Sequence, residues 1–193
     1  MIILVNGPPQ SGKDTFAGIA RRYLINSVEF KMSKPLKDIF RTTFSHINGK
    51  MLGLLLEEYK DKKMYKEHEA TPRDFQIAMY CCLAEMYGDS VLGWLALERL
   101  KKEIATHIIV SDAGRDEEVM KIIEAYDYSQ VGIVELSRPG CTFEGDCRGY
   151  LSDETKRHVK YKAAINNEHD MDMYEAQVRR LLDKWGVKRA TED

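Results

Sequence analysis

Short apolar runs alternate with longer stretches of helical periodicity along most of this 193-residue chain. This alternation is typical of an α/β protein in which helices cover both faces of a parallel sheet. Strands of such a sheet are buried on both sides and therefore read as nearly continuous apolar runs. Five runs are predicted to be the strands: Ile2–Asn6, Val28–Met32, His107–Asp112, Val131–Leu136 and Ala163–Asn166.

One helix is predicted after each of the first two strands. From about Lys13 to Asn26, apolar residues recur on one helical face. A second helix is predicted to begin near Ser33, because serine caps helices and Pro35 follows in the first turn, where its missing N–H costs nothing.

Residues 46–104 interrupt the alternation, since a simple crossover between strands needs only about half this length. Helical periodicity returns at Arg73–Tyr87 and Val91–Ile104. We interpret residues 46–104 as a helical, substrate-binding insertion in a single domain of residues 1–193, with a lid at about 138–160.

The segment after the first predicted strand carries the strongest functional signal, Gly7-Pro8-Pro9-Gln10-Ser11-Gly12-Lys13. The spacing G-x-x-x-x-G-K between a strand and a helix indicates a phosphate-binding loop. Glycines let the backbone curl so that successive N–H groups face one anion, and the helix N-terminus adds its dipole. Lys13 supplies a point charge for the outer phosphates.

The residue after Lys13 departs from the usual motif, because Asp14 stands where Ser or Thr would bind magnesium. Magnesium retains several waters and favours carboxylate and phosphate oxygens. Two arrangements are therefore open. Either Asp14 reaches the metal, directly or through a water, or Thr15 binds phosphate beside it.

Polar residues follow two later strands. Ligands of doubly wound sheets bind beyond the carboxyl ends of the strands. Asp112 is therefore placed to hold magnesium through water, orient a substrate or receive a proton; the alternative is that it caps the helix starting near Asp116. Arg138 and Arg148 are lid candidates, because arginines that close over a transferring phosphoryl group stabilise its charge. The alternative for both is an ordinary surface arginine.

The insertion contains a second group of candidates. Thr71 and Pro72 suit the cap and first position of a helix, which places Arg73 in its first turn. A cation there opposes the helix dipole, which suggests a use such as binding a substrate phosphate. Gln76 lies one turn further on the same face and could read a base edge. Lys34 opens the second predicted helix, another position suited to an anion.

Composition and charge limit the kinds of partner and the cellular location that are expected. The formal net charge of −2 shows no basic excess, so small nucleotides are expected as partners rather than polymeric nucleic acid. No apolar run approaches twenty residues, so no membrane span is expected. The chain begins directly with a predicted strand, so no signal peptide is expected. Cys81 and Cys82 lie in an apolar stretch and are interpreted as core residues; free thiols favour the cytoplasm.

These residues together resemble those of the phage deoxynucleoside monophosphate kinases. The resemblance extends over nearly the whole chain, and the unusual Gly-Lys-Asp-Thr ending of the loop is shared with that family. The segments that carry it are Gly12-Lys13-Asp14-Thr15, Ser33-Lys34-Pro35-Leu36-Lys37, Thr71-Pro72-Arg73-Asp74-Phe75-Gln76, Tyr87-Gly88-Asp89, Ser111-Asp112-Ala113-Gly114-Arg115 and Ile165-Asn166-Asn167.

The resemblance implies a three-layer P-loop kinase fold and transfer of phosphate from ATP, with Mg²⁺, to a deoxynucleoside monophosphate. It allows for a homodimer, and for the host cytoplasm if the protein is phage-encoded. The resulting candidates are Lys13, Arg138 and Asp112 for catalysis; Gly7, Gln10, Ser11, Gly12, Lys13, Asp14 and Thr15 for ATP; Asp14 and Thr15 for the metal; and Lys34, Arg73, Gln76, Arg115 and Arg148 for the acceptor.

One departure from that family is at Pro9 and Gln10, where its loop often carries basic residues. Arg138 or Arg148 would then supply this part of the phosphate grip.

Two other functions fit the same loop. One is a kinase for another small phosphorylated acceptor such as phosphomevalonate, since related kinases share the Lys-Asp pair. The other is a nucleotide-hydrolysing switch, although no recognisable glutamine-bearing switch motif is present.

Overall fold

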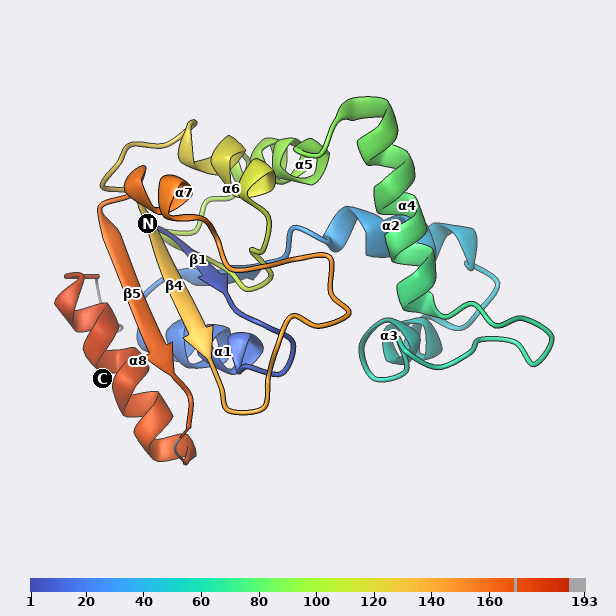
Figure 1. The fold of residues 1–193 in the computed structure, drawn as a ribbon, viewed down its shortest axis with the longest axis horizontal. Helices are drawn as coiled ribbons and strands as arrows, with labels where there is room; N and C mark the ends of the chain where they lie inside the picture. The colour runs from blue at the N-terminus through green and yellow to red at the C-terminus, as the bar shows by residue number, and fades with distance from the viewer. Residues whose placement is uncertain (169, 188–193) are drawn as a thin grey trace. The chain divides into compact units, whose positions relative to one another are not determined.

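The centre of the protein is a five-stranded sheet in which every strand pair is parallel, with the order β2-β3-β1-β4-β5. We describe it from a computed structural model, which covers residues 1–168 and 170–187 (Figure 1). The strands are β1 (Ile2–Asn6), β2 (Ser27–Phe30), β3 (His107–Val110), β4 (Val131–Ser137) and β5 (Tyr161–Asn166). The predicted α/β class and parallel five-stranded sheet are confirmed, and this strand order is typical of P-loop kinases.

Helices cover both faces of the sheet. On one face, α1 (Lys13–Tyr23) and α8 (Met171–Lys184) pack their apolar sides against Ile3 and Val134 (Figure 1). On the other, α6 (Asp116–Ile123) and two buried residues of α5 (Val91–Leu100), Ala96 and Leu100, pack against apolar residues of β1, β3 and β4. The short α7 (Asp153–Arg157) precedes β5. Successive side chains of a strand point to opposite faces, so the alternate residues of β1 serve both cores.

The first helix ends three residues earlier than predicted, at Tyr23. Leu24 is already extended, and Asn26 takes a positive φ of 46°. The hydroxyl of Ser27 then donates to the carbonyl oxygens of Arg21 and Leu24, which satisfies groups that the ending helix leaves open.

The chain divides into two compact units: residues 1–32 with the described residues from 93 onward, and residues 33–92. The second unit contains α2 (Lys34–Thr43), α3 (Gly49–Glu57) and α4 (Pro72–Tyr87). Its core is aromatic and aliphatic: Phe40 packs edge-on against Phe75 at 5.3 Å between ring centroids, beside buried Leu52 and Leu56. The predicted single domain with an insertion at 46–104 remains a prediction.

Two features of this unit differ from the sequence-based expectation. Helix α3 was not predicted, because Gly49 and Gly53 lower its intrinsic propensity. Cys81 and Cys82 were expected in the core, but both are exposed. Apolar residues lie around most of α4, so the sequence does not show which face of the helix, the one that carries Tyr80, is buried.

None of the described helices is both long enough and apolar enough to cross a lipid bilayer.

Candidate functional site

Glycine is required at both ends of the loop that joins β1 to α1. A Cβ on Gly7 would lie 2.6 Å from the carbonyl oxygen of Leu136. Gly12 has a φ of 101°, and a Cβ there would lie 2.6 Å from Nδ2 of Asn167. The loop therefore curls tightly against the ends of neighbouring strands, as the phosphate-loop motif predicts.

Lys13 lies back along this loop. Its Nζ donates hydrogen bonds to the carbonyl oxygens of Gly7 at 2.6 Å and Pro8 at 2.5 Å. Burial, and to a lesser extent the positive charge of Arg148, lowers the pKa of Lys13 to about 8, although the carboxylates of Asp14, Asp146 and Asp112 act in the opposite direction. The lysine is thus a desolvated cation among charged groups of both signs.

Two residues from the far end of the chain brace the loop. Nδ2 of Asn167 donates to the carbonyl oxygen of Ser11 at 3.0 Å, and the hydroxyl of Tyr174 donates to that of Gly12 at 3.1 Å. The Ser11 hydroxyl, in contrast, is buried and has no hydrogen-bond partner among the described residues. A buried polar atom without a partner is costly, and a phosphate oxygen would satisfy it. The loop therefore fits a polyphosphate ligand.

A charged network lies beside the first turn of α1. Lys31 Nζ is 2.8 Å from the Asp14 carboxylate and 3.7 Å from that of Glu29. The Ser111 hydroxyl donates to Glu29 at 2.6 Å. Neither Glu29 nor Lys31 was recognised from the sequence, because both belong to an edge strand and its exit with no motif of their own.

Asp112 binds the chain between β2 and α2 rather than the helix that follows it. Its Oδ1 accepts a hydrogen bond from the backbone N–H of Met32 at 2.8 Å. The N-cap of α6 is Arg115, so the capping alternative for Asp112 does not describe the structure.

The candidate metal ligands differ in exposure, because Asp14 is exposed while Thr15 and Asp112 are half-buried. The Asp14 side chain is 78% exposed. Among residues 1–168 and 170–187, no three His, Cys, Asp or Glu side chains group as a metal site. Magnesium commonly completes its shell with waters and phosphate oxygens. Asp14, Thr15 and Asp112 therefore fit the metal only as part of a nucleotide complex.

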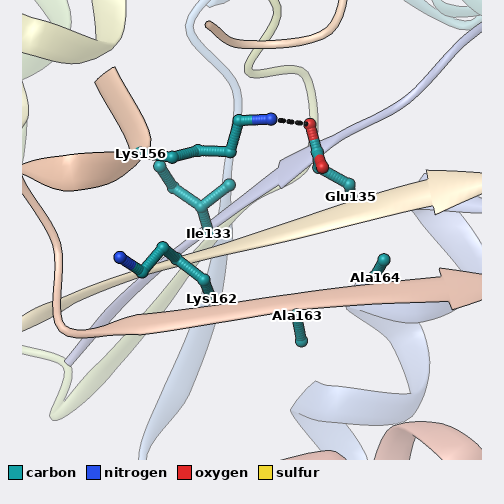
Figure 2. A pocket seen from close by; sticks show the side chains of 6 residues that line it. All are labelled: Ile133, Glu135, Lys156, Lys162, Ala163 and Ala164. Atoms are coloured by element: carbon teal, nitrogen blue, oxygen red, sulfur yellow. Dashed lines mark hydrogen bonds and ion pairs between the residues drawn. The ribbon is translucent and has the colours of Figure 1, made fainter. Parts of the chain in front are cut away.

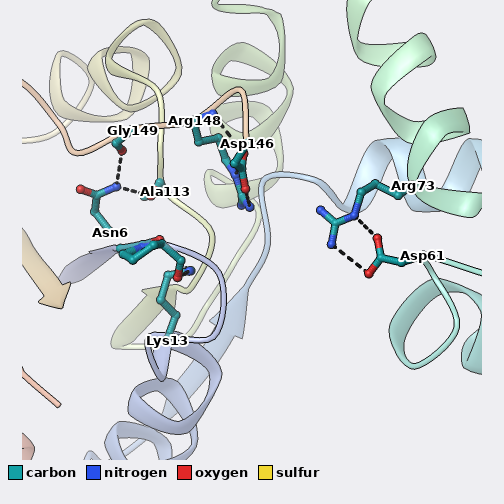
Figure 3. Close-up of polar contacts among 10 residues, drawn as sticks. Asn6, Lys13, Asp61, Arg73, Ala113, Asp146, Arg148 and Gly149 are labelled. Carbon is teal, nitrogen blue, oxygen red and sulfur yellow. Dashed lines mark hydrogen bonds and ion pairs between the residues drawn. The ribbon is translucent and has the colours of Figure 1, made fainter. Parts of the chain in front are cut away.

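The two lid arginines differ in how they are held. Arg138 Nη1 donates to the carbonyl oxygen of Gln10 in the loop at 3.3 Å. Arg148 makes a two-pronged ion pair with Asp146, from Nε at 2.9 Å and from Nη2 at 2.6 Å (Figure 3). Both arginines thus belong to the same unit as the phosphate loop.

Glu118, in the first turn of α6, is a buried carboxyl. It is 4% exposed, and its Oε1 is 3.7 Å from Nε of Arg115. Burial raises the pKa of Glu118 to about 7; the nearby Arg115 opposes this rise and Asp112 contributes to it. Asp116 instead accepts hydrogen bonds from the N–H and hydroxyl of Ser152.

The three acceptor candidates in residues 33–92 each contact a neighbour in that unit. Lys34 Nζ is 2.7 Å from Asp38, and Gln76 donates to the Pro72 carbonyl oxygen at 3.2 Å. Arg73 forms an ion pair with Asp61, in the charged stretch before α4 (Figure 3). An acceptor phosphate would have to compete with Asp61 for this arginine.

A shallow cavity of about 230 Å³ is lined by residues of β4 and β5 and by Lys156 of α7 (Figure 2). Glu135 and Lys156, which line it, are ion-paired at 2.9 Å. The loop residues do not line it, so it is not part of the candidate site.

The sheet order and the loop define a P-loop kinase-like fold. No family model matches the chain, and no curated protein matches it. Among solved structures, a dephospho-CoA kinase from Campylobacter jejuni is 16% identical, with a TM-score of 0.41 over 95% of this chain and 94% of that one.

Two further matches are comparably distant. A tunicamycin resistance protein of Deinococcus radiodurans is 9% identical, with a TM-score of 0.44 over 99% of both chains. An unliganded sugar kinase from Janibacter sp. HTCC2649 is 14% identical, with a TM-score of 0.39 over 95% of this chain and 92% of that one. At these values the likenesses carry no conclusion about activity.

Proposed function

We propose that this protein is an ATP-dependent kinase that phosphorylates a deoxynucleoside monophosphate to the diphosphate. The observation that supports this most is the loop from Gly7 to Lys13, curled at two obligatory glycines, with a desolvated lysine and the buried Ser11 hydroxyl. A buried hydroxyl without a partner among the described residues, and a lysine that donates to two carbonyl oxygens, are groups that a polyphosphate would satisfy.

In the proposed reaction an oxygen of the acceptor phosphate attacks the outer phosphorus of ATP. The bond from that phosphorus to the bridging oxygen breaks, and ADP leaves with the electron pair. The acceptor is already an anion, so little deprotonation is needed, and catalysis consists mainly of positioning and charge stabilisation. Lys13 would leave the carbonyl oxygens of Gly7 and Pro8 to neutralise the transferring group, and Arg138 and Arg148 would share that role.

Asp14 and Thr15 are the residues proposed to hold Mg²⁺, with Asp112 acting through water. Magnesium would neutralise the outer phosphates of ATP. Asp14 is ion-paired with Lys31, so this ammonium is the group that a metal would replace.

Lys34, Arg73, Gln76 and Arg115 are proposed to bind the acceptor. An arginine fork suits a phosphate, and an amide can read a base edge. Preference for a deoxynucleotide rests on the resemblance of these segments to the phage kinases.

The proposal is tested by incubating the protein with Mg-ATP and a panel of ribo- and deoxynucleoside monophosphates, and scoring the diphosphate products. We expect a deoxynucleoside diphosphate to form, with ADP released in equal amount. Phosphomevalonate and a reaction without acceptor are the two matched arms. Product formed only from phosphomevalonate would support a kinase for another phosphorylated acceptor instead. ADP release that no acceptor accelerates would support a nucleotide-hydrolysing switch instead.

A further inference from the structure

Asn6 is a fully buried amide at the end of the apolar strand β1, directly before the phosphate loop. Its Nδ2 donates to the carbonyl oxygens of Ala113 at 3.0 Å and Gly149 at 2.9 Å (Figure 3). Its Oδ1 accepts from the N–H of Leu151 at 3.0 Å. One side chain therefore joins three segments: the start of the phosphate loop, the loop after β3, and the far part of the lid.

Other contacts fasten the same part of the lid. The N–H of Gly149 donates to the carbonyl oxygen of Gly114 at 3.1 Å, and that of Ser152 donates to Asp116 at 3.0 Å. Residues 149–152 are thus held through the N–H groups of Gly149 and Ser152, on both sides of Leu151.

Arg148 lies directly before this fastened segment. Its guanidinium is held by Asp146, and its own N–H donates to the same carboxylate at 3.0 Å. Gly114 leaves room for its stem, because a Cβ at that position would lie 2.9 Å from Cδ of Arg148. Arg148 is therefore fixed through its backbone, its side chain and its packing. Arg138, in contrast, is exposed and donates to the carbonyl oxygen of Gln10 in the loop at 3.3 Å.

We propose that Asn6 is a positioning residue that fixes Arg148 beside the phosphate loop before nucleotide binds, a role that rests on the kinase function proposed above. A cation that is already in place needs no reorganisation when charge develops on the transferring group. Asn6 itself touches no substrate, and acts only through the segment that carries Arg148.

Hydrogen exchange tests the mechanical part without any enzyme assay. In Asn6→Ala, we expect the amides of residues 146–151 to exchange about tenfold faster or more, because the hydrogen bond to Leu151 and the one accepted by Gly149 are both lost. Val178→Ala is the control, since it truncates a fully buried side chain on the opposite face of the sheet. Unchanged exchange in Asn6→Ala would overturn the proposal, and so would an equal increase in Val178→Ala.

A double-mutant cycle tests the functional part. We expect Asn6→Ala to lower kcat about 10- to 100-fold, the effect of a small misplacement of a catalytic group. In an Arg148→Ala background the same change should cost less than about twofold, because the group that it positions is gone. If the factors by which Asn6→Ala and Arg148→Ala lower kcat simply multiply in the double variant, the positioning role is overturned. Val178→Ala should have the same small effect in both backgrounds.

The two proposals fail separately. Protein that phosphorylates no acceptor would refute the kinase, while the exchange experiment would still decide whether Asn6 holds the lid. Normal transfer with multiplicative effects would refute only the role of Asn6. If Asn6→Ala does not fold, Asn6→Ser replaces it, because serine fills part of the space and cannot span all three partners.

Discussion

The ammonium nitrogen of Lys13 lies 2.6 Å from the carbonyl oxygen of Gly7, so the last residue of the loop motif is hydrogen-bonded to its first. The contact stabilises the curl of the loop. It also implies that Lys13 exchanges hydrogen-bond partners on binding, because a polyphosphate requires the ammonium to leave carbonyl oxygens for phosphate oxygens.

Replacing Lys13 by methionine should abolish transfer while leaving the fold intact. The side chain keeps its length, but its charge at the transferring group is lost, so we expect kcat to fall by at least about 10³-fold. Coupled ADP release measures this, and circular dichroism checks the fold. Lys101→Met, at an exposed lysine paired with Glu98, is the matched control and should keep full activity. Residual activity above a tenth in Lys13→Met would remove its catalytic role.

The lowered pKa of Lys13 predicts proton uptake on nucleotide binding. With a pKa of about 8, about half of the molecules carry a neutral lysine at pH 8. Phosphates favour the charged form, so the pKa rises on binding and protons are taken from solution. Calorimetry of ATP binding in two buffers of different ionisation enthalpy should show uptake of up to about half a proton at pH 8 and less at pH 6.5. Lys13→Met should show none of this proton uptake. The same uptake in that variant would show that another group takes up the proton.

Arg73 and Asp61 should affect acceptor binding in opposite directions. Arg73→Ala removes the proposed phosphate fork, so the KM for the acceptor should rise about tenfold or more, with the KM for ATP changed less than about twofold. Asp61→Asn removes the carboxylate that competes for Arg73, so the acceptor KM should fall. Initial rates at varied concentrations of each substrate separate the two. A larger effect of Arg73→Ala on ATP would move this residue to the donor site.

Glu118 should make the free energy of unfolding depend on pH. Its pKa is about 7 in the folded protein and about 4.5 in the unfolded chain, so between these values the folded state binds more protons. Stability from this group is therefore fully present below about pH 4.5 and is lost as pH rises through 7. Glu118→Gln should raise the free energy of unfolding on the order of 2 kcal/mol at pH 8 relative to the wild type, and little at pH 4.5. Urea unfolding at the two pH values measures this; a difference independent of pH would contradict it.

Asp14 and Thr15 can be separated by their dependence on metal. We expect Asp14→Ala to raise the Mg²⁺ concentration needed for half-maximal binding about tenfold, because a carboxylate ligand is lost. Thr15→Val should weaken nucleotide binding with little change in that concentration. Mn²⁺ titration followed by electron paramagnetic resonance, with a non-hydrolysable ATP analogue, reads the metal directly. Equal metal affinity in Asp14→Ala and wild type would favour Thr15.

The parts of the fold predicted correctly from the sequence are those with local signatures. The apolar strands and the loop from Gly7 to Lys13 depend on neighbouring residues, so their pattern is legible in a short window. Asn6, Asn167 and Tyr174 were not assigned by local pattern to hold the loop or lid, because their partners lie between 107 and 162 residues away along the chain. No local pattern marks which buried amide or hydroxyl will meet a distant carbonyl oxygen.

The roles of the candidate site residues stay predictions, although the structure places many of them. Lys13, Asp112, Arg115, Arg138 and Arg148 belong to the unit that holds the phosphate loop, whereas Lys34, Arg73 and Gln76 belong to residues 33–92. Glu118 illustrates why charge in a helix's first turn is ambiguous in sequence. The same acidic run Asp116-Glu117-Glu118 contains a half-buried, an exposed and a buried carboxyl, and only packing distinguishes them.

The hydroxyl of Tyr174 on Gly12, together with the amide of Asn167 on Ser11, has a consequence for synthesis of the protein. The motif is synthesised before its supports, because Asn167 and Tyr174 follow it by more than 150 residues. We expect a nascent chain released before residue 167 to ignore ATP, although every residue of the motif is already present. The ability to capture nucleotide would then arise only once α8 has been made and has docked on the loop, so nucleotide binding would report that this packing is complete.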